Sequence, residues 1–220
     1  MKRFFRNQGL SLVLGVLFLI FLWAQSLSGY YHYNNEQQEH GQPSVSYSAY
    51  ITGNHFLEAT MENWESEFLQ MFFFVILTVF LYQKGSAESK DPDKEEEVDK
   101  DPASSRKKTA PWPVRKRGWI LKIYEHSLSL AFLLLFFGSF FLHAVGGAGE
   151  YNDDQKEHGR LERVTTTEYM TTTRFWFESL QNWQSEFLAV GSMVVLTIFL
   201  REKGSKESKP VEAPHDEGDS

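Results

Sequence analysis

A duplicated block constrains this chain more than any other feature of the sequence. Residues 63–90 recur at 182–209 with a constant offset of 119, and 17 of the 28 aligned positions are identical. Each copy begins Asn-Trp-x-Ser-Glu-Phe-Leu and ends Lys-Gly-Ser-x-Glu-Ser-Lys. A repeat this close indicates that one structural unit is built twice, so the fold assigned to one copy must suit the other.

A long apolar run precedes each copy. Residues 10–27 are almost wholly apolar, and they match residues 128–145 at an offset of 118. The basic residues before the first run are also typical of a signal peptide. However, the second run is internal, and a cleaved signal cannot be internal. About 20 apolar residues cross the hydrocarbon core of a bilayer. We therefore predict that both runs are retained transmembrane helices.

The duplicated block predicts a second long helix in each half. The apolar residues 68–82 would reach only about 22 Å as a helix, which is less than the thickness of the hydrocarbon core. Leu57, Met61, Trp64 and Phe68 continue the pattern backwards at spacings of three and four, as one face of a helix does. We predict continuous helices over residues 55–83 and 175–201. The expected fold is all-α, with four transmembrane helices built as two parallel-oriented two-helix repeats.

Composition separates the repeats from two charged segments. Residues 91–115 are rich in Asp, Glu, Lys and Pro, which predicts a disordered linker between a first repeat at 1–90 and a second at 116–209. Residues 210–220 are predicted to be a disordered tail. Lys and Arg cluster at the N-terminus, in the linker and after the second repeat, so the positive-inside rule places these segments in the cytoplasm. Residues 28–55 are then a polar outer loop.

Glu67 and Glu186 are the leading candidates for a functional pair. Each occupies the same position in its copy of the block, on the helix face expected to be apolar. An ionisable residue inside a membrane is costly and often functional. Three hypotheses stay open: headgroup-level carboxylates, a structural hydrogen bond between the halves, and ion or proton handling.

Two further sets of residues repeat with the helices. The Asn-Trp pair that opens each block is expected to anchor its helix at the membrane surface, because Trp favours the interface between membrane and water. These residues are Asn63 and Trp64 in the first block, and Asn182 and Trp183 in the second. The outer loops carry a Glu-His-Gly motif in both halves: Glu39 and His40 in the first, Glu157 and His158 in the second. These nitrogen and oxygen ligands could hold a metal, although a polar turn ending at Gly41 or Gly159 is the simpler hypothesis.

The paired blocks resemble a family of small bacterial membrane proteins known only as a domain of unknown function. The resemblance covers most of the chain outside the linker and tail. It implies a multi-pass protein of the bacterial inner membrane. It implies no activity, cofactor or catalytic residue.

The sequence favours a non-enzymatic membrane protein with a structural or partner-binding role in the cell envelope. The alternative is a small transporter or channel subunit that uses Glu67 and Glu186. The expected partners are the lipid bilayer and either another membrane protein or a second copy of the chain. The net charge of −7 argues against a nucleic-acid partner. The lack of cysteine excludes disulfides and thiolate chemistry. No cofactor motif is present.

Overall fold

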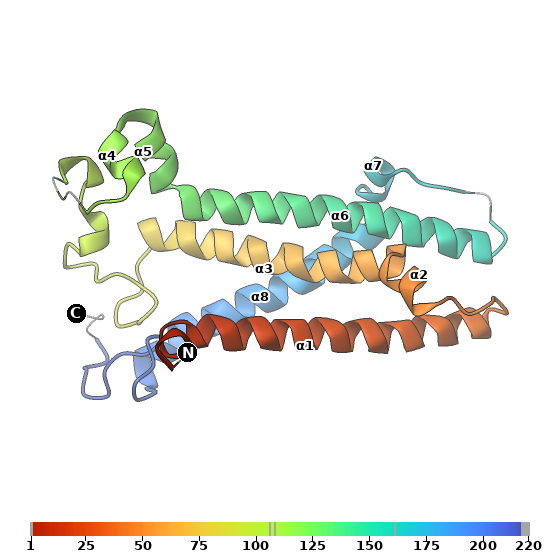
Figure 1. The fold of residues 1–220 in the computed structure, drawn as a ribbon, viewed down its shortest axis with the longest axis horizontal. Coiled ribbons are helices and arrows are strands. Elements are labelled where there is room, and N and C mark those ends of the chain that lie inside the picture. Colours follow the sequence, from red (N-terminus) through yellow and green to blue (C-terminus); the bar gives the residue numbers. More distant parts are fainter. Residues whose placement is uncertain (1, 106, 108, 161, 217–220) are drawn as a thin grey trace. The chain divides into compact units, whose positions relative to one another are not determined.

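The computed structural model describes residues 2–105, 107, 109–160 and 162–216. Within these ranges every regular element is a helix (Figure 1). Four helices are long: α1 (Lys2–Glu39), α3 (Asn54–Phe80), α6 (Ser127–Glu157) and α8 (Thr173–Phe199). The short elements are α2 (Tyr47–Ile51), η1 (Glu97–Asp99), η2 (Pro102–Ser104), α4 (Trp112–Lys116), α5 (Gly118–Glu125) and α7 (Thr166–Tyr169). The all-α prediction is confirmed.

The helices α3 and α8 run without a break through Glu67 and Glu186. Both begin slightly before the predicted residues 55 and 175, and both end slightly before residues 83 and 201. The prediction of continuous helices is therefore confirmed. After each of them the Lys-Gly-Ser-x-Glu-Ser-Lys motif turns the chain, with Gly85 and Gly204 in the left-handed region at φ +85° and +89°. Each glycine lies five residues beyond the end of its helix, so it shapes a turn within the loop, where the N–H groups of Ser86 and Ser205 donate to the carbonyls of Gln83 and Glu202.

The helices α1 and α6 are longer than the sequence predicted. The apolar runs end near residues 27 and 145, yet the helices continue to Glu39 and Glu157. The segment assigned to a polar outer loop is thus helical over its first part, and that assignment was wrong for residues 28–39. Two of the polar residues here, Asn34 and Gln37, are buried. Gly41 and Gly159 end both helices at φ +70° and +68°.

In the part of the chain that the structure describes, two helices are long and apolar enough, by length and composition, to cross a membrane: Arg3–Glu39 and Ser127–Glu157. Only 6% of the apolar window of the first and 28% of that of the second is buried. A core helix of a soluble protein would be mostly buried. The other two predicted spans, α3 and α8, are not among these two. In α3 the carboxylates of Glu58, Glu62 and Glu65 interrupt the apolar composition.

The chain divides into two compact units, which we describe separately. The first unit comprises Met1–Met61 and Phe141–Phe175, and the second comprises Glu62–Phe140 and Trp176–Ser220. The long helices α3, α6 and α8 each contribute one part to each unit. The unit boundaries therefore differ from those of the two sequence repeats.

In the first unit the duplication extends to individual hydrogen bonds. The side chain of Asn34 accepts from the backbone N–H of Val45 at 2.7 Å and donates to its carbonyl at 3.2 Å. The side chain of Asn152 makes the same two bonds to Val164, at 2.8 and 2.9 Å. Each Asn therefore fixes the extended chain that returns along its helix toward α2 or α7.

In the second unit the Lys-Gly-Ser-x-Glu-Ser-Lys motif forms the same loop twice. The hydroxyl of Ser89 accepts from the N–H of Gln83 at 2.8 Å, and that of Ser208 accepts from Glu202 at 2.9 Å. This repeated bond closes the turn after α3 and after α8.

The predicted linker and tail are only partly described. The short helices η1 and η2 lie in the linker, and Lys90, just before it, donates to Asp99 at 2.6 Å. Arg106 and Lys108 of the predicted linker and residues 217–220 of the predicted tail lie outside the described residues. The disorder of both segments stays a prediction.

Polar residues outnumber apolar ones among the buried residues that the structure describes. On α3 the buried residues include Glu58, Glu65 and Gln70, whereas Phe73, Leu77 and Phe80 are exposed. On α1, all the large apolar side chains between Val13 and Phe21 are exposed. Such a distribution is the reverse of that in a soluble globular protein, in which large apolar residues are mostly buried.

Candidate functional site

Glu58, on the second turn of α3, is the centre of a buried polar cluster in the first unit. Glu58 is almost fully buried, with only 6% of its surface exposed. The hydroxyl of Tyr169 donates to its Oε1 at 3.0 Å, and the guanidinium of Arg174 lies 3.5 Å from the same oxygen. A buried carboxylate is costly unless it is paired and hydrogen-bonded, and these two groups provide both interactions.

Local sequence positions Tyr169 for this contact. Thr165 caps α7 by accepting from the N–H of Glu168, and the Glu168 side chain accepts from the Thr165 N–H in return. This capping box satisfies free donors at the start of the helix. The fully buried Tyr169 ring packs against Gly147 of α6, where a Cβ atom would overlap it. The cap and the glycine together direct the phenol toward Glu58.

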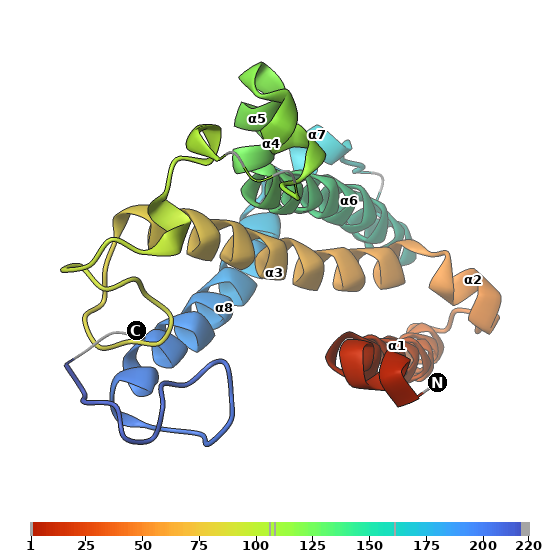
Figure 2. The same ribbon diagram turned by 60° about the vertical axis from the view of Figure 1, so that its left-hand side comes forward.

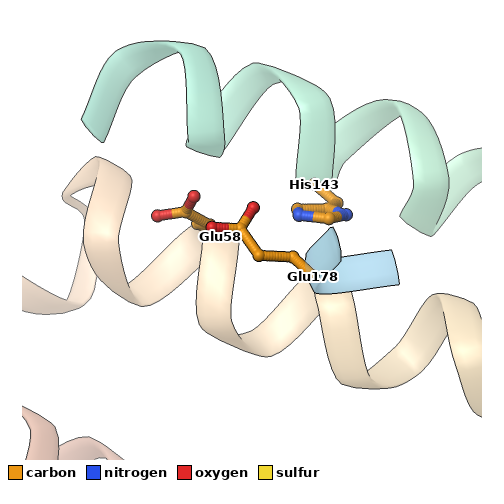
Figure 3. Close-up of side chains that lie close together, drawn as sticks. All are labelled: Glu58, His143 and Glu178. Atoms are coloured by element: carbon orange, nitrogen blue, oxygen red, sulfur yellow. The ribbon is translucent and has the colours of Figure 1, made fainter. Parts of the chain in front are cut away.

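His143 of α6 completes the cluster. It is fully buried, and its ring stacks on Phe175 with 4.8 Å between centroids. A ring nitrogen lies within 4.8 Å of a Glu58 carboxylate oxygen, and Figure 3 shows both side chains on the facing helices α3 and α6. We call Glu58, His143, Tyr169 and Arg174 the Glu58 cluster.

The equivalent tyrosine of the first repeat has a neutral partner. Tyr50 of α2 is buried against Gly29, as Tyr169 is against Gly147. Its hydroxyl lies 3.2 Å from Nδ1 of His55, which occupies the repeat position of Arg174. Burial, together with the charge of Glu150, raises the pKa of Tyr50 to about 12, so the phenol keeps its proton. The hydrogen-bond partner of this phenol is thus an imidazole, whereas that of Tyr169 is a carboxylate.

In the second unit, the second copy of the block, on α8, contacts acidic residues of α3. The Asn182 side chain donates to Glu62, and the Trp183 indole donates to Glu65 at 3.2 Å. The carboxyl groups of Glu67 and Glu186 lie within hydrogen-bonding reach of each other. The structure thus brings the two predicted glutamates together. Asn63, in contrast, is exposed, and Trp64 is half-buried.

The predicted face of α3 was wrong in one respect. Glu67 was expected on the buried side, but it is exposed, while Glu65 is fully buried. The reason is that the polar stripe of the helix, and not the stripe of Leu57 and Trp64, packs inward. Glu58, Glu62 and Glu65 recur at spacings of four and three, which places them on one helix face. This pattern was the available signal for Glu58 and Glu65.

Tyr169 and Arg174 were also missed, because the sequence shows them only as isolated residues of a polar segment. His143 is fully buried, and its ring stacks on Phe175 at the start of α8.

The Glu-His motifs of the two repeats also meet in the first unit. The rings of His40 and His158 are 5.4 Å apart between centroids, and Nδ1 of His40 is 3.8 Å from Glu157. Gln37 donates to the same Glu157 carboxylate at 2.7 Å. Glu39 is exposed. A metal role for these residues stays an alternative hypothesis to the predicted polar turn.

A second pair of equivalent glutamates meets in the loops of the second unit. Glu88 and Glu207 occupy the same position in the two Lys-Gly-Ser-x-Glu-Ser-Lys motifs. Burial raises the pKa of Glu88, and the charge and hydrogen bond of Glu207 raise it further. There are thus two pairs of neighbouring carboxyl groups, Glu67 with Glu186 and Glu88 with Glu207. Each pair takes one glutamate from each repeat.

The whole chain, residues 1–220, matches the family model for a domain of unknown function, DUF6766. The chain belongs to the DUF6766 family. No curated protein and no solved structure matches it.

The Glu58 cluster combines an ion pair, a proton donor and possible metal ligands. Arg174 supplies a positive charge to Glu58, and Tyr169 supplies a proton donor. Glu58 and His143 offer the oxygen and nitrogen ligands that a divalent metal ion uses.

Proposed function

We propose that this DUF6766 chain is a multi-pass integral membrane protein of the bacterial inner membrane with a non-enzymatic, structural or partner-binding role. The observation that carries the proposal is the reversed polarity of the helices, with carboxylates and amides buried and large apolar side chains exposed. In a bilayer this arrangement is favourable, because lipid solvates the apolar faces while polar groups must find partners inside the protein.

The proposal includes all four long helices as spans, although α3 and α8 are less apolar than α1 and α6. Their acidic residues do not exclude them, because Glu62 and Glu65 have partners on α8 that would keep these carboxylates away from lipid. Ionisable residues inside membranes are almost always arranged so that they face the protein interior. The two-helix repeats would then have the same orientation, with both termini and the linker in the cytoplasm.

Membrane extraction tests this proposal. Cell membranes that contain the full chain are washed with alkaline carbonate and then floated through a density gradient. We expect the chain to stay with the floating lipid, as a chain with buried spans does. Release of the chain into the carbonate wash would contradict the proposal.

One observation favours a second function, that of a small transporter or channel subunit. Glu67 and Glu186 meet at equivalent positions, and a pair of carboxyl groups in contact can share a proton or hold a cation. Proton flux into vesicles that contain the purified chain tests this function. Flux that Glu67→Gln abolishes and Glu88→Gln leaves unchanged would support it, and absence of flux above empty vesicles would exclude proton transport.

A further inference from the structure

A basic and aromatic surface lies directly before α6 in the second unit. It consists of the short helices α4 and α5, and a single residue, His126, separates α5 from α6 (Figure 2). Trp112 is 54% exposed and Trp119 is 71% exposed. Because α6 is one of the two helices apolar enough to cross a membrane, this surface lies at the end of a candidate span.

The apolar side chains of α5 form two groups. Leu121 is 4% exposed and packs inward. Trp119 and Ile123 are exposed and lie four residues apart, so they share one face of the helix. Trp and Tyr side chains favour the headgroup region because one part is apolar and the other polar. An exposed Trp–Ile face beside a span therefore suits the surface of a bilayer.

The charges of the same segment are almost all positive. The exposed basic residues are Arg115, Lys116 and Arg117 at the end of α4, and Lys122 on α5. Lys122 lies three residues after Trp119, on the same side of the helix as the exposed Trp–Ile face. Glu125 is the only acidic residue between 111 and 126. Residues 91–101, by contrast, are rich in Asp and Glu. Positive charge is thus concentrated next to the span.

We propose that the α4–α5 surface docks on the anionic lipid headgroups of the cytoplasmic leaflet. The inference rests on the proposed membrane function and adds a lipid class to it. The four basic side chains attract the headgroups, and the Trp119–Ile123 face enters the interface. A basic amphipathic helix beside a membrane binds in this way through apolar burial combined with attraction to anionic lipid.

A single fluorescent label tests the inference in the full chain. The chain has no cysteine, so Glu125→Cys provides one site for a polarity-sensitive dye at the end of α5. The labelled protein is placed in nanodiscs of phosphatidylcholine alone, or with roughly one quarter phosphatidylglycerol. We expect a blue shift of the dye emission only with phosphatidylglycerol, and its reversal as salt rises from about 0.1 M to about 1 M.

Two matched variants give the result its specificity. In the first, Arg115, Lys116, Arg117 and Lys122 are replaced by Gln; in the control, Lys94, Lys100, Lys203 and Lys206 are replaced by Gln. Each basic residue removed from the surface should lower the ratio of docked to undocked segment about fivefold. The first variant should therefore lose the blue shift and the control should retain it.

Three results would overturn the inference: an equal emission in both lipids, equal loss in both variants, or a shift that Trp119→Ser leaves unchanged. Carbonate extraction of the same labelled chain separates this failure from failure of the membrane proposal. A chain that stays in the membrane but shows no lipid-dependent shift contradicts only the docking of α4–α5.

Discussion

The two repeats share their loops but differ in how their first helices pack. Asn34 and Asn152 hold equivalent chains with the same two bonds, and Ser89 and Ser208 close equivalent turns. The helix α1, however, is almost free of buried residues along its apolar window, whereas α6 buries several. The difference shows that the duplicated sequence retains its turn chemistry even where the packing of its two copies has diverged.

Glycine explains part of this divergence. On α6, a Cβ atom at Gly146 would lie 2.6 Å from the backbone nitrogen of Glu58, so the absence of a side chain permits close contact with α3. The equivalent residue of α1 is Ser28. Gly15 on α1 and Gly138 on α6 both lie in open space. Close backbone approach through small residues is a common means of helix association in membranes.

The largest expected effect follows from this contact. Gly146→Leu should destabilise the protein by about 3 kcal/mol, since the backbone of Glu58 cannot move aside as a flexible side chain can. Thermal unfolding in detergent measures the change. Gly138→Leu, on the same helix but in open space, is the control and should lose almost nothing. Equal losses in both variants would show that the close approach of α6 to Glu58 is unimportant.

The tyrosines give the next largest difference between the repeats. Tyr169→Phe removes a hydrogen bond to a buried carboxylate and should cost about 2 kcal/mol, because bonds to charged groups are the strong ones. Tyr50→Phe removes a bond to a neutral imidazole and should cost about 1 kcal/mol. Unfolding temperatures of the two variants, measured side by side, test the order. A larger loss for Tyr50→Phe would contradict the central role of Glu58.

The loops should respond alike. Asn34→Ala and Asn152→Ala each remove two hydrogen bonds to one backbone residue and should each cost about 1 kcal/mol. Parallel thermal scans of the two variants provide the measurement. Gln38→Ala, which loses one exposed bond to Ser44, serves as a control with a smaller effect. A twofold difference between the Asn variants would mean that the turns are less alike than their bonds.

The smallest effect concerns the contact between equivalent loops. Burial and Glu207 raise the pKa of Glu88, so the stabilisation from its protonated form is present at low pH and is lost as pH rises through the raised pKa. Glu88→Gln mimics the protonated form. It should raise the unfolding temperature at neutral pH, and the gain should vanish below pH of about 4, where both folded and unfolded chains are protonated. A lower unfolding temperature at neutral pH would contradict this assignment.

The sequence predicted those parts of the structure that depend on local pattern. The unbroken helices through Glu67 and Glu186 followed from the spacing of the apolar residues. The length of α1 could not be predicted, because Asn34 and Gln37 resemble loop residues until a neighbouring chain provides their partners. The burial of Glu65 instead of Glu67 depended on which face of α3 packs inward, and Glu58 acquires its partners from residues more than 100 positions away.

The number of spans is the central claim, and single-cysteine labelling tests it most directly. Ser48 and Thr167 are equivalent exposed residues of the two predicted outer loops, and Ser104 is an exposed residue of the linker. With four spans, an impermeant reagent added to intact cells should label Ser48→Cys and Thr167→Cys but not Ser104→Cys. If only α1 and α6 cross, Ser48→Cys and Ser104→Cys will be labelled and Thr167→Cys will not, which would contradict the four-span architecture.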